Sequence, residues 1–218
     1  MPVISVGIFL LIVLLFIAML QVEFLEIAFA KLGLTPESTL LLIIGTLIGS
    51  GINLPVYKTR TKATGHFVQL PGKPPVWELF KPAREGYTVI AVNIGGCIIP
   101  VGLCIYFFMQ QTLEPLKLLL AILAISTLSY KFSRSIPGIG VAMPILIPPL
   151  VAAVLALMLD PAHAAQFAYI SGVLGVLLGA DIFRLKEIFT LGAPVASIGG
   201  AGTFDGIFLT GIIAALLA

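Results

Sequence analysis

The sequence predicts an all-α fold, a polytopic transmembrane helix bundle of about seven spans that forms a single membrane domain, residues 1–218. Hydrophobic residues make up 59% of the chain and charged residues only 10%, against roughly 45–50% apolar and about 25% charged in a soluble domain. Apolar stretches of spanning length recur along the chain, and Gly and Pro interrupt several of them. The net charge of +2 is too small to predict a nucleic-acid partner, so membrane lipids are the expected surroundings.

The first two predicted spans have different starting signals. Residues 3–20 are apolar from their beginning and lack a basic region or a cleavage site, so we expect a retained helix rather than a removed signal. The second span has a helix start in its sequence: Thr35 can cap, Pro36 suits the first turn, and Glu37 favours the positive helix end. It ends in residues 49–55, which are rich in residues that do not favour helix.

Residues 56–86 form the one long polar stretch and are predicted to be a cytoplasmic loop. Within it, residues 56–70 alternate loosely around Ala63-Thr64-Gly65, a pattern compatible with a β-hairpin. The following Pro71-Gly72-Lys73-Pro74-Pro75 then favours extended chain.

The remaining predicted spans are residues 87–109, 115–130, 136–159, 164–183 and 190–218. Prolines should make the first half of the fifth span irregular, because each breaks the helical hydrogen-bond ladder. In the last span, Thr203 could cap a new half-helix that starts at Phe204. The predicted breaks are residues 51–55, 93–96, 137–140 and 197–202. Non-helical backbone at membrane depth is tolerated only where it is buried or lines a cavity, so these breaks predict a polar interior.

The basic residues predict the orientation. In this arrangement the 56–86 loop, Lys131 with Arg134, and Arg184 with Lys186 fall on one side. Only Lys31 and Lys117 fall on the other. By the positive-inside rule, the N-terminus should be cytoplasmic and the C-terminus outside.

Two aspartates lie in strongly apolar sequence, where a charge costs about 2.5–3.5 kcal/mol on insertion scales. Asp181 is near the cytoplasmic end of the sixth span, and pairing with Arg184 or Lys186 is its simpler interpretation. Asp205 lies about 20 Å from the C-terminus at helical rise, close to mid-membrane. A helix dipole would offset only about 0.3–1 kcal/mol of its cost. Both residues are therefore candidates for function.

Two carboxyls in a low-dielectric site share a proton, which is the chemistry of aspartic proteolysis. Asp181 and Asp205 are thus the candidate catalytic dyad, with peptide bonds of membrane-embedded peptides as substrate. Asp205, at a helix start, would be the ionised member and Asp181 the acid, although coupled sites titrate as a pair. The sequence has no metal-ligand spacing, so neither a metal site nor another cofactor is expected.

A small ion- or proton-coupled transporter is the alternative, because broken helices also build transporter binding sites. Asp205 would then be the ion site, with Asn53 and Asn93 at the breaks and Ser197 and Thr203 nearby as further binding residues. Each glycine cluster could equally serve close helix packing, and Asn53 could be an ordinary helix cap. A structural or assembly role is a third hypothesis that the buried carboxylates disfavour. The oligomeric state is open.

The chain resembles an uncharacterised family of bacterial and archaeal multi-pass membrane proteins of unknown function. The resemblance covers most of the chain and rests on the motifs Gly49-Ser50-Gly51-Ile52-Asn53, Val92-Asn93-Ile94-Gly95-Gly96, Pro137-Gly138-Ile139-Gly140, Gly179-Ala180-Asp181 and Gly199-Gly200-Ala201-Gly202-Thr203-Phe204-Asp205-Gly206. It implies a prokaryotic protein of the inner (plasma) membrane and no particular activity.

Asp181, preceded by Gly179 and Ala180, together with a second aspartate in an adjacent span, is also similar to the GxGD class of intramembrane aspartyl proteases. The chain departs from that class at position 178, which is Leu in place of the first Gly. It also lacks a Tyr before either aspartate and a following Pro-Ala-Leu sequence. The resemblance therefore implies only the two aspartates as site residues.

Overall fold

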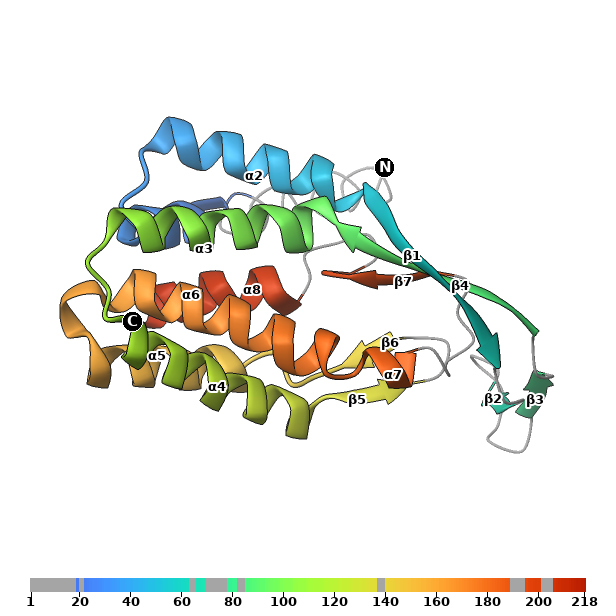
Figure 1. Cartoon of the computed structure of the whole chain (residues 1–218). Helices are drawn as coiled ribbons and strands as arrows, with labels where there is room; N and C mark the ends of the chain where they lie inside the picture. The colour runs from blue at the N-terminus through green and yellow to red at the C-terminus, as the bar shows by residue number, and fades with distance from the viewer. Residues whose placement is uncertain are drawn as a thin grey trace, which may run out of the picture.

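The computed structural model describes residues 19, 22–62, 66–69, 78–81, 85–136, 140–188, 195–200 and 206–218. The described chain is mostly helical, and its long helices lie side by side with their axes along one common direction (Figure 1). The strands gather beyond one end of these helices, which we call the strand-bearing end. The opposite end, which holds the short connections and the C-terminus, is called the loop end.

The prediction of an all-α fold is wrong in one respect, because the structure contains strands. The central sheet has the order β1-β4-β7: β1 (Asn53–Lys62) runs antiparallel to β4 (Glu85–Asn93), and β4 runs parallel to β7 (Val195–Ile198). Two further pairs are antiparallel, β2 (His66–Gln69) with β3 (Glu78–Lys81) and β5 (Arg134–Ile136) with β6 (Gly140–Ala142).

The predicted β-hairpin around residues 63–65 is also wrong in its pairing. Strand β1 pairs with β4, far along the chain, so that Asn53 faces Asn93 and Lys62 faces Glu85. The register shifts between Pro55 and Tyr57, where proline has no N–H to donate to the ladder. Residues 63–65 themselves lie outside the described residues. The predicted span at 87–109 accordingly begins as strand, and its helical part starts only at Ile94.

The helices follow local signals in the sequence. The predicted start of the second span is confirmed, since Thr35 Oγ1 accepts a hydrogen bond from Ser38 N at 3.3 Å and Pro36 occupies the first turn. Residues 22–31 are also helical. The helical elements from there are α2 (Pro36–Ser50), η1 (Ile94–Ile98), α3 (Ile99–Gln110), α4 (Pro115–Phe132), α5 (Ile147–Leu159), η2 (Pro161–His163), α6 (Ala164–Val176), η3 (Leu177–Ile182), α7 (Leu185–Ile188) and α8 (Gly206–Leu217).

Two helical segments among the described residues are long and apolar enough to cross a membrane, Pro115–Phe132 and Pro161–Glu187. Shorter apolar helices of 10–17 residues are Pro36–Ser50, Ile94–Gln110, Ile147–Leu159 and Gly206–Leu217. The predicted irregular first half of the 136–159 segment is confirmed, because β5 and β6 precede α5. The predicted first span lies almost wholly outside the described residues, and the count of about seven spans stays a prediction.

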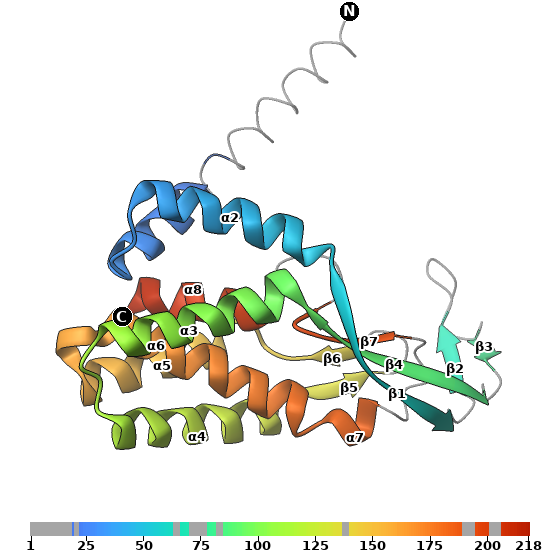
Figure 2. The same ribbon diagram turned by 45° about the horizontal axis from the view of Figure 1, so that its top comes forward.

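Helix α6 is the centre of the core. It packs against α3, α4, α5 and α8, and both views place it between α2 and α4, which lie at opposite faces of the bundle (Figure 2). Its buried Tyr169 meets Phe107 of α3 edge to face, with ring centroids 5.5 Å apart. Because α6 packs against four helices, its continuation η3 has a defined place at the strand-bearing end, where it also contacts α4.

Candidate functional site

Asp181 lies at the strand-bearing end of the core helix. It belongs to η3, a π-helical turn that continues α6 directly, and its side chain is half-buried. Its Oδ2 accepts a hydrogen bond from the backbone N–H of Gly199, at 3.3 Å. Single π-helical turns in longer helices are frequent at functional sites, because the wider turn redirects side chains. The turn therefore aims a carboxylate at the end of strand β7.

The backbone of Gly199 brings that strand end into place. Gly199 has φ +82°, a conformation that L side chains rarely adopt. A Cβ at this position would lie 2.6 Å from Cys97 Cβ and 2.8 Å from the carbonyl carbon of Gly96. Only glycine allows the chain after β7 to lie this close to η1. The glycine-rich break is evident in the sequence, but the approach of its N–H to Asp181 is not, because the two residues are far apart along the chain.

Asp181 lines a cavity of about 240 Å³. Its other walls come from η3 and the end of α6, from strand β6 and the residues after it, and from the first turn of α8, namely Ala180, Val176, Val141, Ala142, Met143, Ile145, Gly206 and Ile207. Gly206 directly follows Asp205 in the sequence. Asp205 and Thr203 lie outside the described residues, so the distance between the two carboxyls stays a prediction.

A network of polar side chains lies at the junction of α2, η1 and the sheet. Asn93 is 1% exposed, and its Oδ1 accepts a hydrogen bond from Gly96 N at 2.8 Å, which caps η1. Its Nδ2 donates to Ser50 O at 2.7 Å and to Asn53 Oδ1 at 3.1 Å. Ser197 Oγ also donates to Asn53 Oδ1, at 2.5 Å. The structure thus brings together three of the predicted polar residues, Asn53, Asn93 and Ser197.

The amide oxygens in this network already accept hydrogen bonds from protein donors. Asn53 Oδ1 accepts from Asn93 and Ser197, and Asn93 Oδ1 accepts from Gly96. A bound cation needs several oxygens whose lone pairs can point at it. The geometry therefore favours a positioning role, in which the network holds β7 against the sheet two residues before Gly199.

Arg184, the partner that the sequence suggests for Asp181, takes part in a separate cluster. Its Nη1 donates to Glu187 Oε2 at 2.6 Å, its Nε to Ser133 Oγ at 2.6 Å, and its Nη2 to Tyr130 O at 2.5 Å. Ser135 Oγ donates to the same Glu187 oxygen at 2.7 Å. These contacts tie α7 to the end of α4 and to β5. The ion pair of Arg184 is therefore with Glu187, a partner that the sequence did not suggest.

Comparison with known proteins gives a family but no activity. No curated protein and no solved structure matches the chain. A family model described as "Protein of unknown function (DUF1614)" matches residues 47–217. This range includes both aspartates and the whole polar network. Because the match spans most of the chain, the protein belongs to this family of unknown function.

Proposed function

We propose that the protein is an intramembrane aspartyl protease in which Asp181 and Asp205 form the catalytic dyad. One observation carries the proposal: the cavity of about 240 Å³ that Asp181 lines is also lined by Gly206, the residue next to Asp205. A dyad requires two carboxyls close enough to share a proton. The cavity therefore brings Asp181 together with the sequence neighbour of Asp205, as such a dyad requires.

The proposed mechanism uses the two carboxyls as base and acid. The ionised carboxylate takes a proton from a water molecule, whose oxygen attacks the carbonyl carbon of the peptide bond, while the protonated partner donates its proton to the carbonyl oxygen. On breakdown of the tetrahedral intermediate, the two carboxyls exchange roles: the one now protonated gives its proton to the leaving amine as the C–N bond breaks, and the other takes a hydroxyl proton as the new carbonyl forms. The Gly199 N–H can bind Asp181 in either protonation state, since both carry an accepting oxygen.

Strand β7 offers a place for the substrate. In the part of the chain that the structure describes, β7 is at the edge of the central sheet and pairs only with β4. An extended peptide can add to a sheet edge through main-chain hydrogen bonds. A transmembrane peptide that unwinds onto β7 would run beside Gly199 and hence past Asp181. Substrate binding by strand addition therefore needs only the edge of the central sheet and no local hairpin.

The proposal includes the membrane setting: a prokaryotic inner (plasma) membrane, about seven spans, a cytoplasmic N-terminus and a C-terminus outside. Basic side chains support this orientation, since Lys58, Arg60, Lys131 and Arg134 belong to the strand-bearing end. At the loop end, Lys31 donates to Leu216 O at 2.8 Å, and Lys117 pairs with Glu114. The strand-bearing end would therefore face the cytoplasm.

The test is cleavage of single-span model peptides by the purified protein in lipid. We expect cleavage by the wild type and a loss of at least about 1,000-fold in Asp181→Asn and in Asp205→Asn. Glu114→Gln is the matched control, an exposed carboxylate at the loop end that should leave cleavage unchanged. Thermal unfolding checks that each variant folds. Full cleavage by either aspartate variant would exclude the dyad.

The alternative function is a small ion- or proton-coupled transporter. It is favoured by the irregular turns η1 and η3 and by the half-buried Asp181 carboxylate that lines a cavity beside η3. The same preparations distinguish it. A carrier predicts no peptide cleavage by the wild type in lipid, together with a thermal stability that responds to cations or to pH. That response should disappear in Asp205→Asn but persist in Glu114→Gln.

A further inference from the structure

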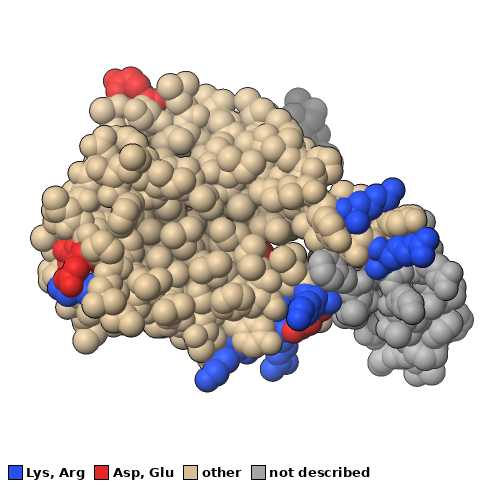
Figure 3. Space-filling view, in the orientation of Figure 1, with Lys and Arg blue, Asp and Glu red and all other residues tan. Residues whose placement is uncertain are grey.

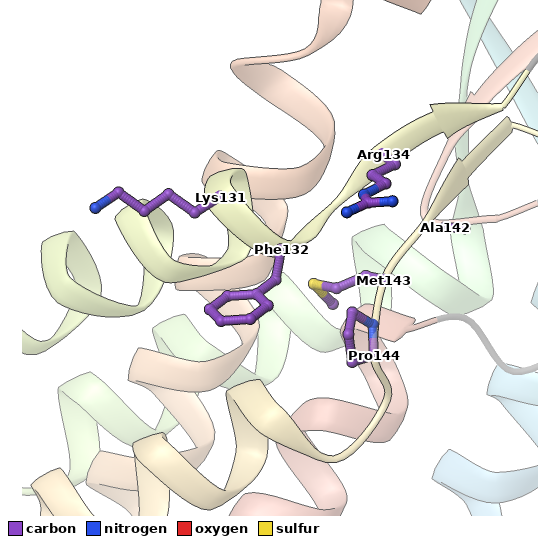
Figure 4. A pocket seen from close by; sticks show the side chains of 6 residues that line it. All are labelled: Lys131, Phe132, Arg134, Ala142, Met143 and Pro144. Atoms are coloured by element: carbon purple, nitrogen blue, oxygen red, sulfur yellow. The ribbon is translucent and has the colours of Figure 1, made fainter.

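We infer that the cytoplasmic end of α4 holds a binding site for the headgroup of an anionic phospholipid. A cavity of about 460 Å³ lies there, lined by Lys131, Phe132, Arg134, Ala142, Met143 and Pro144. It adjoins the Asp181 cavity, with which it shares Ala142 and Met143. Figure 4 shows Arg134 turning from β5 toward the end of α4, with Phe132, Met143 and Pro144 below it, while Lys131 extends outward. The site combines the guanidinium of Arg134 with an apolar floor, and Lys131 lies at its rim.

The position of the cavity along α4 is that of a membrane interface. Helix α4 has 18 residues, a length of about 27 Å at helical rise, which is close to the hydrocarbon thickness of about 30 Å. Its basic residues are Lys117 in the first turn and Lys131 in the last. If α4 spans the bilayer, as proposed above, Lys131 and Arg134 lie at the depth of the lipid phosphates. The inference rests on this placement and not on the protease activity.

The end of α4 beside this cavity has more basic than acidic side chains. Lys131 and Arg134 are exposed, and neither forms an ion pair with any residue that the structure describes. The acidic neighbour Glu187 already accepts hydrogen bonds from Arg184 and Ser135. In Figure 3 blue atoms of Lys and Arg gather at the strand-bearing end, and few red atoms lie among them. An anion entering the cavity would therefore meet the guanidinium of Arg134, and the flexible side chain of Lys131 at the rim could turn toward it.

The chemistry of the lining favours a phospholipid over a free anion. The planar guanidinium of Arg134 can bind two phosphate oxygens at once, and Lys131 adds a point charge on a flexible stem. Phe132, which is 48% exposed, together with Met143 and Pro144, offers apolar surface to the glycerol and the first acyl methylenes. Basic pockets at the cytoplasmic ends of membrane helices recognise anionic headgroups in this way.

The experiment titrates the full-length protein in neutral detergent with phosphatidylglycerol or phosphatidylcholine and counts bound lipid by native mass spectrometry. We expect phosphatidylglycerol to bind more tightly. Each of Lys131→Gln and Arg134→Gln should weaken it by about fivefold, the equivalent of about 1 kcal/mol for each cation at a membrane surface. Lys117→Gln is the matched control, a basic residue at the other end of the same helix, and it should bind as the wild type does.

Two further measurements separate a phospholipid site from a site for any small anion. Arg134→Lys keeps the charge but loses the bidentate geometry, so its binding should lie between wild type and Arg134→Gln. Glycerol phosphate at millimolar concentration should fail to displace the lipid. Equal binding of the two lipids, equal loss in Lys117→Gln, or full displacement by glycerol phosphate would each overturn the inference. Unchanged thermal unfolding of the exposed-site variants excludes misfolding as the cause of a loss.

Discussion

The two ends of the helix bundle are built in different ways. At the loop end the helices finish in ordinary caps and turns: Asp160 caps the turn at His163, Glu114 pairs with Lys117, and Lys31 donates to Leu216 O in the last turn of α8. At the strand-bearing end the helices themselves are irregular, because the π-helical turns η1 and η3 lie there, and two successive positive-φ glycines, Gly199 and Gly200, follow β7. The loop end has one such glycine, Gly33, in the turn before α2.

The interactions differ in the same way as the backbone. At the loop end, the Asp160–His163 and Glu114–Lys117 contacts lie within one turn, and the side chains of Lys31 and Gln166 each reach a distant backbone carbonyl at a helix end. At the strand-bearing end, the distant contacts join the irregular segments to one another. Asn93 binds Ser50, Ser197 binds Asn53, and Gly199 binds Asp181. Irregular backbone leaves polar groups that must find partners elsewhere in the chain. The strand-bearing end is therefore where the molecule holds polar groups in irregular backbone, and the candidate site lies at that end.

The largest effect should come from filling the close contact beneath η3. A Cβ at Gly179 would overlap the carbonyl oxygen of Ser126 on α4, so Gly179→Val should cost more than about 3 kcal/mol or prevent folding. Gly102→Ala is the control, because nothing lies within 4 Å of its added Cβ, and it should change stability by less than about 1 kcal/mol. Thermal unfolding in lipid nanodiscs measures both. A stable Gly179→Val protein would mean that the strand-bearing end is not tightly packed.

The next largest loss of stability should come from removing a buried polar residue, and it should exceed the loss from removing a local helix cap. Asn93→Ala removes the partners of Ser50 O and Gly96 N, and leaving buried groups unpaired costs about 1–3 kcal/mol. Asp160→Ala removes a partly exposed cap at the loop end, where we expect about 1 kcal/mol. Chemical denaturation of the two variants gives the difference. Equal losses would remove the energetic distinction between the ends.

A smaller effect on stability should be the energetic coupling between the side chains of Asn53 and Ser197. Their hydrogen bond of 2.5 Å should give a coupling energy of about 0.5–1.5 kcal/mol in a double-mutant cycle with Asn53→Ala and Ser197→Ala. Unfolding of the two single variants and the double variant measures it. Additive losses would show that the bond does not hold β7 in place.

The smallest effect is expected at the loop end. Glu114 and Lys117 form an exposed pair three residues apart, with a separation of 2.8 Å. Exposed pairs of this kind contribute little, since solvent screens them. Glu114→Gln and Lys117→Gln should therefore leave the unfolding temperature unchanged at both low and high salt. A clear salt-dependent loss would instead make this pair a stabilising feature.

The sequence by itself determined the features that depend on neighbouring residues. The Thr35 cap with Pro36, the extent of the 164–183 helix and the irregular chain before α5 all follow from local signals, and the structure has them. Apolar composition likewise indicated helices long enough to cross a membrane. Asp181 stood out because a charged residue in apolar sequence needs no structural knowledge to be noticed.

Only the tertiary structure decided which distant segments meet. The loose alternation after residue 55 suggested strand, but it pointed to a partner directly after a turn at residues 63–65, whereas the true partner of β1 is β4. The facing of Asn53 and Asn93, and the approach of Gly199 to Asp181, follow from that pairing and from β7 lying beside β4. The physical reason is that helix caps and helix breaks depend on the conformational preferences of a few adjacent residues. Strand pairing depends instead on which distant strand edges the packed helices bring together.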